Sequence, residues 1–125
     1  MRFAKWVFGI AGIYGLVIML PLYFAKTQIG IADPPPITHP EYFYGFLGVT
    51  IAWQLAFLLI AWRPDLYRLF MLAGIAEKAL YGAAAVTLFL QARISGPTFV
   101  FACIDMTFGA LFVVAFALTG GRRVS

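Results

Sequence analysis

The chain has 125 residues, of which 63% are hydrophobic and only 11% are charged, and its mean hydropathy is +0.93. An ordinary soluble domain carries about 25% charged residues, so this composition excludes such a domain and is typical of an integral membrane protein. The net charge of +4 is scattered along the chain and forms no concentrated basic face, which argues against a nucleic-acid partner.

Long apolar segments alternate with short polar ones, and each apolar segment is predicted to form a transmembrane helix of about 20 residues. A β-barrel would instead need short strands of alternating polarity. The expected fold class is all-α: a polytopic, antiparallel bundle of four transmembrane helices, with residues 1–125 as a single domain. The predicted helices are residues 6–24, 42–62, 68–90 and 98–118.

The first helix follows Arg2 and Lys5, a basic start that a secretory signal also has, and residues 30–32 offer small side chains for cleavage. The apolar run is longer than a usual signal core, and the small residues lie well beyond its end. We therefore favour a retained transmembrane helix.

Residues 27–41 are predicted to form an extracytoplasmic loop, stiffened by the prolines at 34–36. Thr38 or His39 is expected to cap the second helix, with Glu41 in its first turn near the positive end of the helix dipole. A surface ligand or proton site at His39 and Glu41 is the alternative, but capping and solvation account for these residues more simply.

The remaining connections, at residues 63–65 and 95–97, are predicted to be tight turns that make neighbouring helices antiparallel. Small residues along each helix should allow close helix packing in lipid. Lys and Arg are more frequent on the side of the chain ends and of the 63–65 turn, which predicts that both termini are cytoplasmic. The expected location is a bacterial inner or plasma membrane.

Each predicted helix places a polar side chain near its centre, so a polar layer is expected at mid-membrane. Lys78 and Asp105 both lie on faces lined with small residues, and a lysine side chain can bridge their difference in depth, so we predict that they pair. Glu77 points elsewhere, because adjacent helical residues diverge by about 100°. Its expected partner is Gln54 or Tyr14, and it would be protonated if it met only neutral donors. The predicted ligand-binding layer comprises Tyr14, Gln54, Glu77, Lys78, Tyr81 and Asp105.

Cys103, the single cysteine, is predicted to lie inside the fourth helix, so no disulfide is expected within the chain, and no spacing of His and Cys indicates a metal site. We predict neither a metal nor a cofactor.

The chain resembles the small four-helix membrane proteins of the DoxX-like and EXPERA type in its Gly-rich first helix and in the acids Glu77, within IAEKALYG, and Asp105, within IDMTFGALF. The resemblance implies a bundle with a buried acidic cavity, found in lipid and sterol binders, sterol isomerases and accessory subunits. The His and Glu pair of the isomerases has no match here, because His39 is too far outward to meet Glu77.

Several functions remain open. The polar layer could serve only to fix helix order. It could instead bind an apolar or lipid-like molecule, and the chain could also be an accessory subunit of a membrane complex. A lipid-modifying enzyme, with Glu77 as the candidate catalytic acid or base, is an alternative. A proton- or ion-conducting homo-oligomer is another. Binding or an accessory role is preferred over catalysis.

Overall fold

The structure is a computed structural model, and it describes residues 2–120 as an all-helical bundle. Four helical spans are long and apolar enough to cross a membrane, and they pack antiparallel. This confirms the predicted fold class and makes the chain a small multi-pass membrane protein. The elements are α1 (Arg2–Met19), η1 (Leu20–Phe24), α2 (Lys26–Ala32), α3 (Pro40–Trp62), α4 (Phe70–Leu90) and α5 (Gly96–Gly120).

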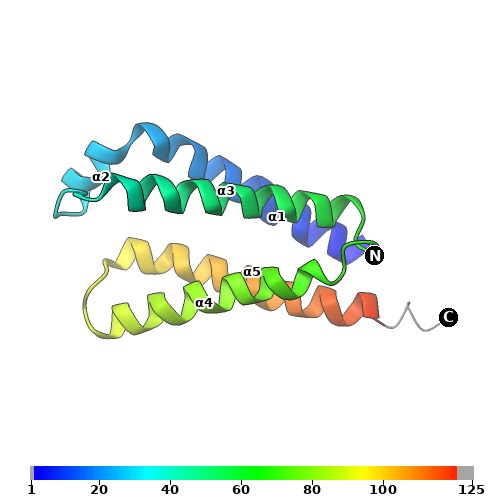
Figure 1. Cartoon of the computed structure of the whole chain (residues 1–125). Coiled ribbons are helices and arrows are strands. Elements are labelled where there is room, and N and C mark those ends of the chain that lie inside the picture. Colours follow the sequence, from blue (N-terminus) through cyan, green and yellow to red (C-terminus); the bar gives the residue numbers. More distant parts are fainter. Residues whose placement is uncertain (1, 121–125) are drawn as a thin grey trace.

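The helices form two antiparallel pairs, as Figure 1 shows: the first pair is α1 with α3, and the second pair is α4 with α5. Contacts between the pairs are made mainly by α1 with α5. The pairs approach each other at the end that holds the start of α1 and the 63–69 turn, here called the terminal end. They diverge toward the opposite end, here called the α2 end, which holds α2 and the 91–95 turn.

The hydrophobic core lies at the terminal end, where three phenylalanines from different helices meet. The rings of Phe8 and Phe112 stack with centroids 4.1 Å apart, and Phe57 approaches Phe112 edge-on at 5.0 Å. All three side chains are fully buried. Because ring pairs of this kind stabilise packing beyond the area that they bury, this cluster joins the two pairs firmly at one end.

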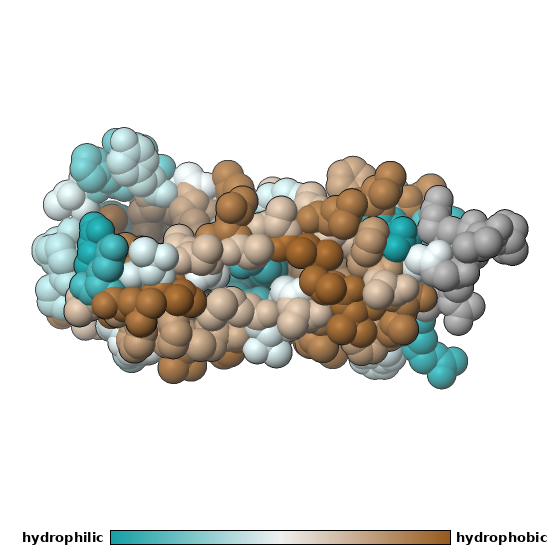
Figure 2. All heavy atoms as spheres, turned by 90° about the horizontal axis from the view of Figure 1, so that it is seen from below, coloured by the Kyte–Doolittle hydropathy of each residue, from teal (hydrophilic) through white to brown (hydrophobic). Residues whose placement is uncertain are grey.

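The outer surface of the bundle is strongly apolar, because large aliphatic and aromatic side chains point outward from every long helix. Figure 2 shows one face, on which hydrophobic residues form a broad middle zone and hydrophilic residues gather toward the ends. One hydrophilic patch interrupts the apolar zone near its centre. In a bilayer an apolar exterior of this kind faces the lipid chains.

Part of the predicted 27–41 loop is helical, a difference from the prediction, which placed no helix in this segment. Lys26–Ala32 forms α2, and residues 33–39 after it are not helical and begin with three bends. The segment KTQIGIA contains no proline, and the helix ends where Asp33 precedes Pro34, a position that disfavours helical geometry. Gly30 is buried, and a Cβ at this position would lie 3.0 Å from Pro36 Cα, so α2 packs closely against the proline segment.

The ends of the long helices also differ from the prediction. The first helix already begins at Arg2, and it tightens into η1 at Leu20, where Pro21 follows. His39 occupies the N-cap position of α3, but it makes no side-chain capping hydrogen bond, so the capping prediction is wrong. His39 and Glu41 lie 4.0 Å apart, and both are exposed.

The α4–α5 turn is held by backbone and side-chain caps. Ala92 has a φ of 58°. The N–H groups of Ala92 and Arg93 donate to the carbonyls of Phe89 and Leu88 in the pattern of a Schellman motif. Ser95 then starts α5, since its Oγ accepts from the Thr98 N–H at 3.4 Å. This turn keeps α4 and α5 antiparallel and adjacent.

Candidate functional site

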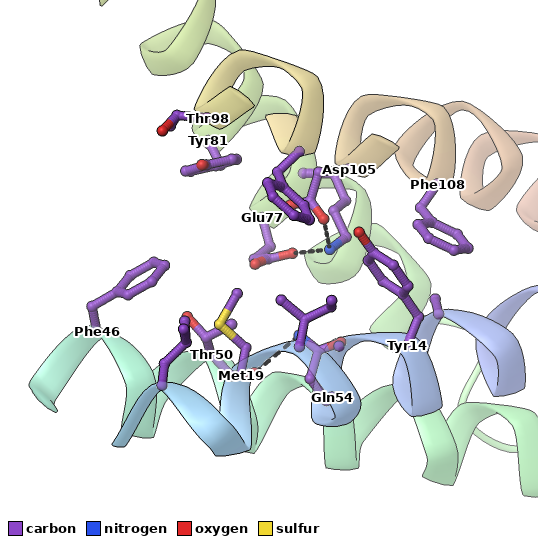
Figure 3. A pocket seen from close by; sticks show the side chains of 16 residues that line it. Tyr14, Met19, Phe46, Thr50, Gln54, Glu77, Tyr81, Thr98, Asp105 and Phe108 are labelled. Atoms are coloured by element: carbon purple, nitrogen blue, oxygen red, sulfur yellow. Dashed lines mark hydrogen bonds and ion pairs between the residues drawn. The ribbon is translucent and has the colours of Figure 1, made fainter. Parts of the chain in front are cut away.

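A cavity of about 290 Å³ lies between the two pairs, on the side of the aromatic core that faces the α2 end. Side chains from α1, α3, α4 and α5 line it, as Figure 3 shows for the labelled residues. Its volume is at the lower end of the range for small-molecule sites in proteins, roughly 300–1,000 Å³. The polar side chains of the lining are Tyr14, Thr50, Gln54, Glu77, Lys78, Tyr81, Thr98 and Asp105.

A cluster of three charged side chains occupies one wall of the cavity. Lys78 Nζ donates a hydrogen bond to Asp105 Oδ1 at 3.0 Å and lies 3.4 Å from Glu77 Oε1. The Lys78 residue is only 4% exposed. The contact predicted between Lys78 and Asp105 is therefore present, and it joins α4 to α5.

Close helix packing positions this cluster. A Cβ at Gly109 of α5 would lie 2.9 Å from Lys78 Cβ, and a Cβ at Gly82 of α4 would lie 2.7 Å from Met106 Cγ. Real side chains do not approach so closely, so only glycine fits where the two helices cross. Because the helix backbones approach at these glycines, the lysine stem reaches the Asp105 carboxylate without leaving the buried interface.

The partners expected for Glu77 are wrong. The Gln54 side chain donates instead to the backbone oxygen of Thr50 at 3.0 Å, and it packs against Gly15, where a Cβ would collide with it. Glu77 approaches Lys78 because the lysine has a long, flexible stem that can bend toward a neighbour in sequence. The direction of the Cα–Cβ bonds on a helix therefore does not decide which groups the end of a lysine side chain meets.

One carboxylate oxygen of the cluster is left without a hydrogen bond. Glu77 Oε1 is buried and, within residues 2–120, has no hydrogen-bonding partner, because its approach to Lys78 lacks hydrogen-bond geometry. In Figure 3 the Glu77 carboxylate points into the space between α4 and the first pair, and the Tyr14 hydroxyl points toward Asp105. A buried acceptor without a donor is costly, so this oxygen is a natural contact point for a bound molecule.

The rest of the lining is largely apolar. Phe46, Phe101 and Phe108 provide aromatic surface, and Ile18 and Leu22 provide aliphatic surface toward the α2 end. The cavity therefore has a charged region at mid-bundle and an apolar region beyond it. That distribution matches an amphipathic molecule with a small polar group and an apolar body.

Two basic residues have structural roles that the sequence analysis did not assign. Arg68 Nε donates to Thr119 Oγ1 at 3.0 Å, and its NH2 group donates to the Phe116 carbonyl at 2.7 Å. The Arg68 guanidinium also lies 3.6 Å from the centroid of the Phe116 ring. Lys5 Nζ donates to the Trp62 carbonyl at 3.2 Å. Both residues bind carbonyls near helix C-terminal ends, where cations are favoured. This general preference is the signal in the sequence that could have predicted their contacts.

Other candidates lie away from the cavity. Neither His39 nor Cys103 lines it. Among residues 2–120, no group of three or more potential metal-ligating side chains lies close together.

The glycine at the α4–α5 crossing gives a direct test of this packing. Gly109→Ala should destabilise the protein by about 1–3 kcal/mol, because the new methyl group overpacks the buried lysine stem. Gly45→Ala in α3 is the matched control: a Cβ there meets nothing within 4 Å, so its thermal unfolding midpoint in detergent should not fall. Equal midpoints for the two variants would contradict the close crossing.

Comparison of this chain with protein-family models, with curated proteins and with solved structures found no match.

Proposed function

We propose that the protein binds a small apolar or lipid-like molecule in the cavity between its two helix pairs. The observation that carries the proposal is the cavity itself, which combines an apolar lining with a buried and incompletely bonded charge cluster. If the polar layer served only to pack the helices, side chains would be expected to fill this space, since protein interiors normally contain few voids larger than a water molecule. Binding without catalysis is the preferred function, and membrane lipids or a lipophilic metabolite are the natural ligand sources.

A lipid-modifying enzyme is the second candidate, favoured by the unbonded Glu77 oxygen, which could accept a proton from a bound substrate. Histidine cannot assist there, since His39 does not line the cavity. The resemblance to DoxX-like and EXPERA proteins is compatible with either candidate. An accessory role beside a larger membrane protein would use the apolar exterior instead, and ion conduction would require a homo-oligomer.

Filling the cavity tests the binding proposal. Ile18 lines the cavity, whereas its neighbour Val17 is 65% exposed on the outer surface. Ile18→Trp should abolish a stoichiometric adduct detected by native mass spectrometry of the detergent-purified protein, because the indole occupies the ligand volume. Val17→Trp should retain the adduct. If wild type carries no adduct even after incubation with lipid extract, or if Ile18→Trp keeps it, the proposal fails.

We further propose that the termini are cytoplasmic, so that the cavity occupies the extracytoplasmic half of the membrane. In a Cys103→Ala background, Pro35→Cys should react with a membrane-impermeant maleimide on intact cells, because the 33–39 segment would be outside. Leu66→Cys, in the turn at the terminal end, should react only after lysis. The opposite labelling pattern would reverse the orientation.

A further inference from the structure

The charges around the cavity are unbalanced, and this imbalance restricts the chemistry of a ligand. Among the described residues, the formally charged side chains of the lining are Glu77, Lys78 and Asp105. Two carboxylates and one ammonium leave a formal charge of −1. The other polar groups of the lining, such as Tyr14 and Gln54, are neutral hydrogen-bonding groups and do not offset this charge.

The single cation of the cluster is already engaged. Lys78 Nζ is bonded to Asp105 and also lies 5.3 Å from the centroid of the Phe57 ring. Glu77 Oε1 is buried and accepts no hydrogen bond, although it shares the charge of Lys78 through an ion pair at 3.4 Å. An incoming group that both carries positive charge and donates a hydrogen bond would satisfy this oxygen and neutralise the cluster. An anionic group would instead face two carboxylates.

The walls near the cluster favour the same kind of group. Tyr14, Tyr81 and Phe108 line the cavity together with the carboxylates. The faces of aromatic rings attract ammonium ions, and the attraction is larger where water is excluded. Aliphatic and aromatic residues toward the α2 end can then accommodate an apolar chain.

We infer that the ligand is an amphipathic cation, with a primary ammonium group on an apolar chain and the ammonium bonded to Glu77. This inference rests on the proposed binding function. The ammonium would lie between Glu77 and the hydroxyl of Tyr14, and the chain would extend toward Phe46 and Leu22. The site is then a complete ion cluster of two cations and two anions only when it is occupied.

A series of ligands with one chain and different headgroups tests the inference. Decylamine, decanol and decanoate are added separately at neutral pH to the full-length protein in a non-ionic detergent, and adducts are quantified by native mass spectrometry. The Ile18→Trp variant supplies the background for each compound. Wild type should bind decylamine at least roughly tenfold more tightly than decanol, equivalent to about 1.4 kcal/mol, and decanoate most weakly.

Glu77→Gln should remove this preference, since the amide keeps the shape of the side chain and loses its charge. Asp105→Asn removes a negative charge from α5 and should also reduce the preference. Agreement between the two variants would show that the change does not come from a folding defect in one of them. Equal binding of decylamine and decanol to wild type, or a preference that survives Glu77→Gln, would overturn the ammonium inference alone. Failure of Ile18→Trp to reduce any adduct would overturn the binding function itself.

A lipid headgroup and a free amine share this chemistry, and one further compound separates them. Lysophosphatidylethanolamine carries a primary ammonium beside a phosphate. Binding as tight as that of decylamine would assign the site to a lipid headgroup. Weaker binding would assign it to a lipophilic amine, because the phosphate would be repelled by the carboxylates.

Discussion

Lys78→Met is expected to destabilise the protein by about 3–5 kcal/mol, the usual cost of removing one partner from a buried ion pair. The loss should be large because two carboxylates, those of Glu77 and Asp105, would remain in the interior without their shared cation. Asp105→Leu should cost less, since Lys78 would keep Glu77 as a partner. The measurement is the thermal unfolding midpoint in a mild detergent.

The double variant distinguishes a real pair from two independent effects. Lys78→Met combined with Asp105→Leu should recover a large part of the loss, because one buried carboxylate is left rather than two. Non-additivity of this kind is the signature of residues in contact. Leu80→Met is the matched control on the same helix, as Leu80 is 73% exposed on the apolar surface. Additive losses, or silent single variants, would show that the two residues are not coupled.

Arg68→Ala is expected to cost about 1.5–3 kcal/mol, the range for hydrogen bonds made by a charged group. The guanidinium joins the start of α4 to the end of α5 through the hydroxyl of Thr119 and the carbonyl of Phe116, and the substitution removes both bonds. Arg68→Lys should recover only part of this stability, since an ammonium lacks the planar fork that makes the two bonds together. Unfolding midpoints in detergent again provide the measurement.

Arg63 offers a control from the same turn. Its guanidinium bonds the Asp65 carboxylate at 3.1 Å and 3.2 Å, and these hydrogen bonds lower the pKa of Asp65. Both side chains are exposed, so solvent screens the pair. Arg63→Ala should therefore change stability far less than Arg68→Ala. A comparable loss in the two variants would mean that the turn itself, rather than the α5 contact, depends on arginine.

The sequence was most informative where helix geometry alone decides the outcome. The four spans follow from continuous apolar length, and the contact between Lys78 and Asp105 follows from matching depth on faces rich in small residues. In both cases the relevant distances are set by the rise of a regular helix. No knowledge of side-chain conformation was needed.

Features that depend on side-chain rotamers or on the angle between helices could not be predicted in this way. The bend of the Lys78 stem toward Glu77 is a rotamer choice. The bond from Arg68 to α5 requires knowing which helix ends are neighbours. The cavity exists because the two pairs diverge, and apolar composition carries no information about that angle. Gln54 lines the cavity, but its amide bonds Thr50 rather than Glu77, which is again a rotamer choice.

The path of the backbone between the two pairs has a mechanical consequence. The 33–39 segment and α2 connect members of the first pair, and the 91–95 turn connects members of the second. Within the described chain, only the 63–69 turn passes from one pair to the other, and it does so beside the aromatic core. At the α2 end the pairs have no covalent tether. Because the phenylalanine cluster and the 63–69 turn lie at the same end, a separation of the two pairs at the α2 end would break no covalent connection within residues 2–120 and would leave every helix intact.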